Sequence, residues 1–295
     1  MIWQTSRFQL DLSRPCIMGI VNVTPDSFSD GGQHASEADA LRHCEKLLED
    51  GAHVLDIGGE SSRPGAQPLS LDQELQRVLP VVRGAVAMGA AVSVDTYKPQ
   101  VMQAVLDLGA DIINDIWALR QPGAIDVVAR HPACGVCLMH MHREPQTMQA
   151  EPMHGDVLAQ VRDFLRAAAS GLRTRGVAAE RIVIDPGIGF GKTVAQNFSL
   201  LARQRELLAE GYPVLAGWSR KSSLASATSR SLADLATLDV HARMVPSVAA
   251  ALLAVERGAR IVRVHDVRET VQALAVLDAT TQACNNNITQ GEQQR

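Results

Sequence analysis

The chain has 295 residues, of which 46% are hydrophobic and 20% charged, a balance typical of a folded protein with a sizeable core. Its formal net charge of −4 gives no sign of binding to polyanions, so we expect no nucleic-acid partner. No apolar run reaches the roughly 20 residues of a membrane span, and the N-terminus shows no secretory signal. We therefore expect no membrane association and a cytoplasmic location.

Short apolar runs alternate with longer segments of helical periodicity along almost the whole chain. Eight such units, with strands rich in Val, Ile and Leu, predict an α/β fold: one TIM (β/α)8 barrel domain over residues 1–295. A doubly wound open sheet is the competitor, which the number of units disfavours. The polar residues 284–295 are expected to form a flexible tail. The predicted strands are 16–21, 53–57, 91–95, 111–115, 135–139, 181–185, 213–217 and 260–264, and the predicted helices are 36–50, 71–88, 98–109, 121–131, 156–175, 195–209, 246–257 and 267–282.

The five cysteines are irregularly spaced, and their odd number argues against a disulfide framework. Cys134 and Cys137 form a C-x-x-C pair, but the run around them is typical of a buried strand, in which residues three apart face opposite sides. No second cysteine pair completes a zinc site, so a metal or redox role is the weaker interpretation.

Polar residues stand at the end of each predicted strand or directly after it. In a barrel these positions all open onto the C-terminal face, where βα loops build active sites. Any one of them could instead be a helix cap or a satisfied core group, but the set as a whole predicts one pocket. The residues are Asn22, Asp56, Asp95, Asn114, Asp115, His140, Asp185, Ser219, Arg220, Lys221, Arg263 and His265.

Two long polar loops follow the first two strands. Residues 21–32 (VNVTPDSFSDGG) offer an amide at Asn22, hydroxyls, carboxylates and one aromatic ring. Residues 58–66 (GGESSRPGA) contain glycines that let the backbone approach a ligand, and Arg63 supplies a forked cation suited to phosphate or carboxylate. A plain turn is the alternative for the second loop.

The segment 185–193 (DPGIGFGKT) looks like a phosphate-binding P-loop, but Pro186 stands where that motif requires glycine. We expect its glycines to give close access to a flat ligand beside Asp185 instead. His140 and His142 could bind a transition metal, but no third ligand has an evident place.

The cations and acceptors at the strand ends indicate two kinds of ligand group. Arg263 and His265 share one face of the last strand and, with Arg63, could hold a diphosphate, with a divalent metal bridging it to Asn22. Three acceptors suit a heterocycle rich in N–H donors, while Lys221 adds a donor for a ring carbonyl or nitrogen. The acceptors are Asp95, Asn114 and Asp185.

These motifs resemble those of the bacterial dihydropteroate synthases. The matching segments, in family order between about residues 10 and 280, are MGIVNVTPDSFSDGG, DIGGESSRPGA, SVDTYKP, IINDI, LMHM, IDPGIGFGK, SRKS and RVHDV. The resemblance implies a TIM barrel, usually a homodimer, that joins 6-hydroxymethyl-7,8-dihydropterin diphosphate to p-aminobenzoate and releases diphosphate. It also implies Mg²⁺ as the cofactor and a sulfonamide target.

The resemblance assigns roles to individual residues. It makes Asn22 the Mg²⁺ ligand and places Asp95, Asn114, Asp185 and Lys221 around the pterin, with Arg63, Arg263 and His265 at the diphosphate. Of these, Lys221, Arg63, Arg263 and His265 would serve the chemistry. The positions near p-aminobenzoate would be Ser62, Pro64, Phe28, Phe190 and Ser222.

Three residues depart from the usual family pattern. Ser62 replaces a common Thr, Trp218 replaces a smaller or more flexible residue and is expected to alter the pocket volume, and Arg143 stands where Gly is frequent. None removes a residue assigned to chemistry.

Two other functions compete with this one. A pterin-binding module of a methyltransferase-like protein would not need Arg63, Lys221, Ser222, Arg263 and His265. An aldolase-like phosphate-binding barrel would need a Schiff-base lysine, for which Lys221 is the well-placed candidate.

Overall fold

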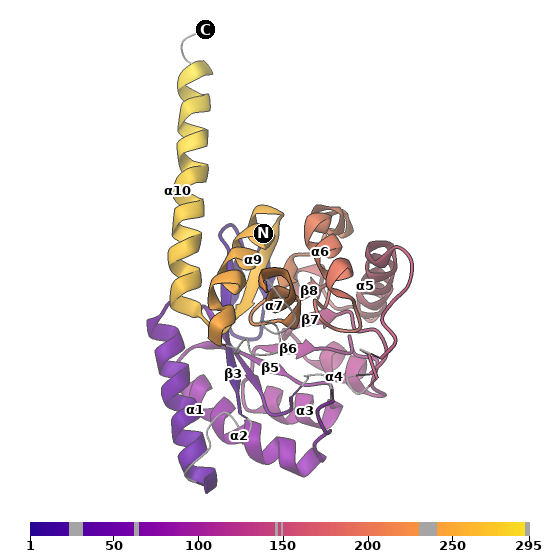
Figure 1. The fold of residues 1–295 in the computed structure, drawn as a ribbon. Helices are drawn as coiled ribbons and strands as arrows, with labels where there is room; N and C mark the ends of the chain where they lie inside the picture. The colour runs from indigo at the N-terminus through magenta and orange to yellow at the C-terminus, as the bar shows by residue number, and fades with distance from the viewer. Residues whose placement is uncertain (24–31, 62–64, 145–146, 149, 230–240, 293–295) are drawn as a thin grey trace.

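The computed structural model describes residues 1–23, 32–61, 65–144, 147–148, 150–229 and 241–292 (Figure 1). Eight parallel strands form a closed barrel in the order β10-β3-β4-β5-β6-β7-β8-β9. The pairing of β10 with β3 closes it, which confirms the predicted barrel and excludes the open sheet. The strands are β3 (Cys16–Asn22), β4 (Val54–Gly58), β5 (Ala91–Asp95), β6 (Ile112–Asp115), β7 (Gly135–Met139), β8 (Ile182–Asp185), β9 (Val214–Ala216) and β10 (Ala259–Val264).

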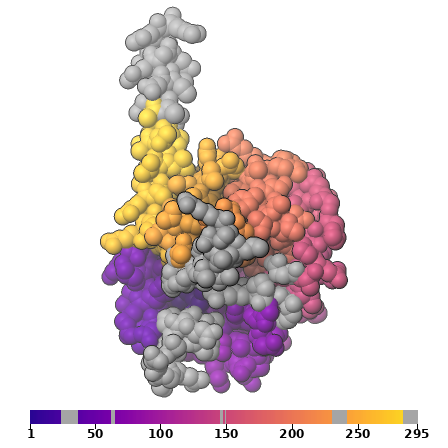
Figure 2. Space-filling model, in the orientation of Figure 1, coloured from indigo at the N-terminus to yellow at the C-terminus, as the bar shows by residue number. Residues whose placement is uncertain are grey.

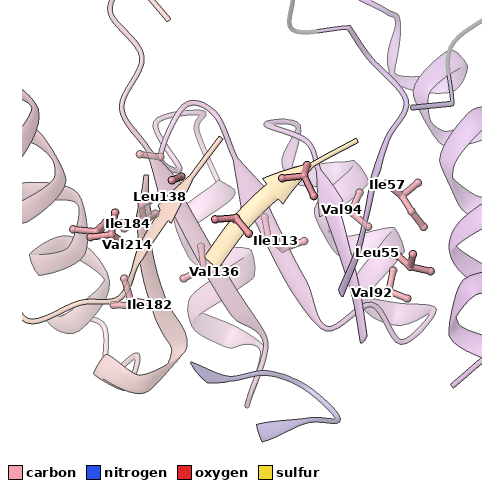
Figure 3. Close-up of a cluster of buried hydrophobic side chains, with 14 of the residues drawn as sticks. Leu55, Ile57, Val92, Val94, Ile113, Val136, Leu138, Ile182, Ile184 and Val214 are labelled. Carbon is pink, nitrogen blue, oxygen red and sulfur yellow. The ribbon is translucent and has the colours of Figure 1, made fainter. Parts of the chain in front are cut away.

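Alternate side chains of each strand face opposite sides of the barrel wall. The outward set packs against the surrounding helices in one large core, with Leu55, Ile57, Val92, Val94, Ile113, Val136, Leu138, Ile182, Ile184 and Val214 labelled in Figure 3. The inward set begins with a separate apolar layer that includes Met18, Val54, Ile112 and Val183. Cys134 belongs to the outer core and Cys137 to the inner layer, so the two thiols face opposite sides, as predicted.

Helices surround the strands (Figure 1). Two of them begin with a capping box in which a hydroxyl and a glutamine exchange hydrogen bonds with the backbone: Ser70 with Gln73 before α2, and Thr193 with Gln196 before α6. The predicted helix 195–209 is two elements, α6 and the 3-10 helix η3 (Gln204–Glu210). The α-helices are α1 (Gly32–Glu49), α2 (Leu71–Ala87), α3 (Pro99–Asp107), α4 (Ala124–Arg130), α5 (Val157–Arg173), α6 (Val194–Ala202), α7 (Ser222–Thr228), α9 (Met244–Glu256) and α10 (Val267–Glu292).

An N-terminal hairpin that the strand prediction missed lies at the N-terminal end of the barrel. It consists of β1 (Ile2–Gln4) and β2 (Gln9–Asp11), which pair antiparallel. Trp3 is fully buried, packs with the inner apolar layer, and donates from Nε1 to the Arg181 carbonyl at 3.0 Å. The hairpin therefore plugs the end of the barrel opposite the predicted site.

Helix α10 begins at Val267, as predicted, but continues to Glu292 rather than ending at residue 282. In Figure 2 this yellow helix stands out from the rounded body of the protein. Within the described residues, no helix combines the length and the apolar character that crossing a bilayer requires.

Candidate active site

A cavity of about 460 Å³, counted with its opening to solvent, lies at the C-terminal end of the barrel. The strand residues that line it continue the inward-facing set, so the barrel places their side chains above the inner apolar layer. Six of the predicted site residues meet here: Asp95, Asn114, Asp185, Phe190, Lys221 and Arg263. The cavity is completed by Ile20, Ile116, Met139, Ile188, Gly217 and Ser219.

Arg263 links two carboxylates across the barrel. Its Nε donates to Asp56 Oδ2 at 2.5 Å and its Nη2 to Asp95 Oδ2 at 2.9 Å. Asn114 Nδ2 also donates to Asp56 Oδ2, at 3.2 Å. Asp56 is fully buried and does not line the cavity. Asp56 is therefore the anchor that orients Arg263 and Asn114, a role that its place on strand β4 alone did not indicate.

Both cavity carboxylates are held in surroundings that disfavour charge. Burial raises the pKa of Asp95 to about 7, although the neighbouring Arg263 opposes this shift. Burial also raises the pKa of Asp185, opposed by the hydrogen bond from the Gly187 amide to Asp185 Oδ1 at 2.7 Å. The charge of Asp95 is favoured by Arg263, whereas the charge of Asp185 is favoured by Lys221, Lys192 and Arg263. Buried carboxylates with shifted pKa values are candidates for contacts with a ligand.

Lys221 and Phe190 form one wall of the cavity. The Lys221 Nζ lies 4.2 Å from the centroid of the Phe190 ring, a cation–π contact. The Cβ that a side chain would add at Gly189 would lie 3.3 Å from Lys221 Cδ, so a glycine there leaves room for the lysine. The two residues come from different loops and meet only in the folded barrel.

Consecutive side chains of the loop after β9 point in different directions. Ser219 Oγ lies 2.9 Å from His265 Nδ1 and accepts the His265 amide at 3.1 Å, so the predicted His265 adjoins the cavity through Ser219. Arg220 turns away from the cavity and pairs with Asp266 at 2.6 Å. The positive φ of Arg220, 58°, produces this change of direction.

The glycines of the 185–193 segment were expected to give a flat ligand close access, but two of them contact another loop instead. A Cβ at Gly187 would lie 1.8 Å from the His140 carbonyl oxygen, and one at Gly191 would lie 2.6 Å from His142 Cβ. Both glycines have positive φ. They therefore allow close packing of two protein loops rather than access for a flat ligand. Lys192, which the prediction left without a role, is buried between these loops.

The structure brings no third metal ligand to the histidine pair within the described residues. The His140 Nδ1 lies 3.0 Å from the Lys192 Nζ, and the described residues contain no cluster of three His, Cys, Asp or Glu side chains that could hold a metal ion. The contact with Lys192 occupies His140 Nδ1, so this nitrogen is not available to a metal ion.

A charged network anchors the root of the second long loop. Glu60 accepts from the Tyr97 hydroxyl at 2.7 Å and from the Leu69 amide at 3.0 Å, and it pairs with Lys98. Lys98 also pairs with the buried Glu74. The loop is therefore tied to the segment between β5 and α3, and through Lys98 to α2, and the sequence gave no sign of these contacts.

Of the remaining predicted residues, two are described but are not among the residues that line the cavity, and four lie outside the described residues. Asn22 is the last residue of β3, and Ser222 is the first residue of α7. Phe28, Ser62, Arg63 and Pro64 lie outside the described residues. Their assigned positions therefore stay predictions.

The pterin binding enzyme family matches residues 18–265 of this chain. A dihydropteroate synthase of Neisseria meningitidis serogroup C is 47% identical over 281 residues, covering 94% of this chain and 97% of the relative. The chain belongs to the dihydropteroate synthase family. The relatives are thus matched over almost their full length, not over a pterin-binding core alone.

Two solved structures extend this likeness to the fold. Burkholderia cenocepacia dihydropteroate synthase, complexed with 7,8-dihydropteroate, is 50% identical with a TM-score of 0.85, covering 97% of this chain and 98% of that one. Xanthomonas albilineans dihydropteroate synthase with 4-aminobenzoic acid is 46% identical with a TM-score of 0.87, covering 95% and 99%.

Two departures from the family pattern acquire a structural meaning. Arg143 has a φ of 61°, a conformation that favours glycine and explains why glycine is frequent there. Trp218 was expected to alter the pocket volume, but it is buried against Phe198 in the outer core and does not line the cavity. Its size therefore affects packing behind the site.

Proposed function

We propose that this chain is a transferase that condenses 6-hydroxymethyl-7,8-dihydropterin diphosphate with p-aminobenzoate to give 7,8-dihydropteroate and diphosphate. The observation that carries this proposal is the meeting of three hydrogen-bond acceptors and two cations in one cavity. The acceptors come from β5, β6 and β8, the cations from β10 and the β9–α7 loop. This set complements a heterocycle with several N–H groups that carries an anionic leaving group.

In the proposed reaction, the bond from the pterin methylene carbon to the diphosphate oxygen breaks first. Asp95, Asn114 and Asp185 hold the pterin ring, and Lys221 donates to a ring carbonyl or nitrogen. Arg263 and His265, with the predicted Arg63, stabilise the charge that develops on the leaving group. The aryl amine then attacks the methylene carbon, a C–N bond forms, and the amine loses a proton. The main contributions are charge stabilisation and positioning, because no strong nucleophile is required.

The second substrate would bind between the cavity wall and the long loops. Phe190 lines the cavity, and Ser222 begins the helix after Lys221. Ser62, Pro64 and Phe28 complete the proposed p-aminobenzoate site on the resemblance alone.

The residues present fit Mg²⁺ only in company with diphosphate. Asn22 supplies one amide oxygen at the end of β3, and the described residues provide no cluster of acidic or histidine ligands that would hold a cation alone. Mg²⁺ commonly takes one or two protein ligands together with substrate phosphates. When bound, the ion would help neutralise the departing diphosphate.

The proposed function has a direct test. Purified protein with Mg²⁺ and the pterin diphosphate should form dihydropteroate when p-aminobenzoate is added, and product is followed by chromatography. Omission of either substrate is the control. Pterin binding without product would favour the binding module, and borohydride trapping of a substrate carbonyl at Lys221 would favour the aldolase.

The raised pKa of Asp95 predicts a pH dependence of pterin binding. As pH falls through about 7, Asp95 takes up a proton and loses acceptor capacity for the pterin N–H groups. Affinity should therefore weaken about tenfold between about pH 8 and about pH 6, if the carboxylate form alone binds. Calorimetry measures this affinity. The ligand should be 6-hydroxymethyl-7,8-dihydropterin, because it lacks the diphosphate group, which would itself take up protons in this pH range. The Asp95→Asn variant should bind the pterin weakly, and its affinity should not change between these pH values. If the variant kept the pH dependence of the wild type, another group would be its cause.

We also propose that the protein is a cytoplasmic homodimer that associates through α9 and α10. Three exposed large apolar side chains lie on these two packed helices, Val245, Leu253 and Val276. Light scattering should give twice the mass of one chain, and Val276→Glu should shift it toward the monomer. A monomer at all concentrations would refute the proposal.

A further inference from the structure

Lys192 is buried in the loop between β8 and α6, with 2% of its surface exposed. Its Nζ lies 2.8 Å from the Gly187 carbonyl oxygen, 3.1 Å from that of Phe190 and 3.4 Å from that of His140. The fourth neighbour is His140 Nδ1, at 3.0 Å. The direct contacts of the ammonium are therefore backbone oxygens and one imidazole, while the charge of Asp185 favours it from a distance.

This arrangement requires a neutral His140. Burial is the main cause that lowers the pKa of His140 to about 2, and the nearby Lys192 contributes. Neutral imidazole with its proton on Nε2 leaves the Nδ1 lone pair free to accept from Lys192. Burial likewise lowers the pKa of Lys192 to about 7. A buried ammonium costs several kcal/mol unless its donors are satisfied, and here four acceptors surround three donors.

Two of the three carbonyl groups that Lys192 contacts, those of Gly187 and Phe190, belong to the turn that forms the cavity wall. The Phe190 amide donates to the Gly187 carbonyl at 3.2 Å, which closes the turn, and the Lys192 Nζ binds the carbonyls at both ends of it. Ile188 and Phe190, carried by the same turn, line the cavity. Lys192 itself does not line the cavity, so it has no access to substrate.

The 187–191 turn depends on its contacts for its shape, because three of its five residues are glycines. Gly187 and Gly191 approach the 140–142 backbone with no room for a Cβ, and both adopt positive φ. Glycines have the greatest conformational freedom in the chain, so a glycine-rich turn needs other groups to fix it. Asn197 holds the turn from the other side, accepting from the Gly189 amide at 2.9 Å.

We propose that Lys192 is a positioning residue that fixes the 187–191 turn from behind and so sets the place of Phe190 and Ile188 in the substrate cavity. The ligands named in the test rest on the proposed function, whereas the contacts of Lys192 do not depend on it. A lysine of lowered basicity often indicates a catalytic amine. Here its burial and its four protein contacts assign it a supporting role instead.

Arg181 provides a matched control at the opposite end of β8. It is also a buried cation, and its guanidinium donates to the Cys134 carbonyl at 2.7 Å and the Val128 carbonyl at 2.9 Å. It lies next to Trp3, far from the cavity along the strand. Lys192→Met and Arg181→Met thus both remove a backbone-bound buried cation, but only Lys192 supports the cavity wall.

The test compares substrate affinity in the two variants. Both should lower thermal stability. Lys192→Met should also weaken calorimetric binding of the pterin diphosphate, and raise KM for p-aminobenzoate, by at least about tenfold, with a smaller effect on kcat. Arg181→Met should leave both affinities at the wild-type value. Wild-type affinity in Lys192→Met, or an equal loss in Arg181→Met, would overturn the proposal.

A second variant keeps the test decisive if Lys192→Met does not fold. Lys192→Arg retains the charge, but its planar guanidinium cannot place one nitrogen among four acceptors, so affinity should fall less than in Lys192→Met. Wild-type affinity in Lys192→Arg, with no folded methionine variant, would count against the proposal. Because pterin binding is measured without p-aminobenzoate, it reports on Lys192 even if the wild-type protein forms no dihydropteroate.

Discussion

Arg263→Met is expected to lower the free energy of unfolding by about 3 kcal/mol, because the variant leaves two carboxylates without their shared cation. Asp56 is fully buried and Asp95 is largely buried, and the Arg263 guanidinium donates to both. A buried charge that loses its partner cannot regain its hydration. Urea denaturation of the protein without ligand measures this loss.

The same substitution should reduce dihydropteroate formation by about 100-fold or more, since Arg263 is one of the cations proposed to stabilise the leaving diphosphate. It should also allow Asn114 and Asp95 to move, because both are tied to the Arg263–Asp56 pair. Steady-state kinetics at a temperature where the variant is folded separates this effect from instability.

Arg260→Met is the matched control on the same strand. Arg260 is exposed, so its loss should change the free energy of unfolding by less than about 0.5 kcal/mol and leave activity unchanged. Adding Asp56→Asn to Arg263→Met should recover part of the stability but none of the activity, because it removes a buried charge without restoring the cation. Full activity in Arg263→Met would contradict the proposed role at the diphosphate.

Much of this site could be predicted from the sequence, because a barrel places the ends of all its strands on the same face. Asp95, Asn114 and Asp185 each end a strand, and the parallel closed sheet brings all such positions to one face. Alternation along the last strand placed Arg263 and His265 on one face of it, and in the structure Arg263 lines the cavity. For these residues, strand position was sufficient, and no knowledge of a specific contact was required.

The contacts that support the site could not be predicted in this way. The pairing of Arg263 with Asp56 joins residues 207 positions apart, and nothing near Asp56 indicates its partner. The glycines beside Lys192 suggested ligand access, yet the close approach of a second loop explains two of them. Arg220 was predicted to open onto the same pocket as Lys221, but it has a positive φ and pairs with Asp266. Such details depend on tertiary packing, which local pattern does not encode.

The N-terminal hairpin, at the other end of the barrel, could not be predicted from the sequence either. Each of its strands has three residues, so neither carries a periodic pattern long enough to predict a strand. Gly135, at the start of β7, packs against the hairpin. A Cβ at this position would lie 3.0 Å from Trp3 Nε1 and 3.2 Å from the Gln4 carbonyl oxygen. The hairpin and the barrel floor are therefore complementary surfaces that only the structure brings together.

Trp3→Ala is expected to cost about 3 to 5 kcal/mol of stability, the usual loss when a large buried aromatic side chain is removed from a packed core. Trp3 packs at the floor of the barrel with Met18, Val54 and Ile112. Trp3→Phe should cost less, because it keeps a ring and loses about 1 kcal/mol for the bond to the Arg181 carbonyl. Urea denaturation measures both.

Trp3→Ala should nevertheless leave kcat and KM at their wild-type values wherever the variant stays folded, because the inner apolar layer separates the hairpin from the cavity at the opposite end of the barrel. Ile2→Ala is the control, since Ile2 is an exposed hydrophobic neighbour on the same strand and should change stability little. A rise in KM in folded Trp3→Ala would show that the barrel transmits strain from its floor to the substrate cavity. Unchanged kinetics with lost stability would mean that this barrel separates the residues that hold it together from those that act on substrate, with the Arg263–Asp56 pair as a place where the two roles meet.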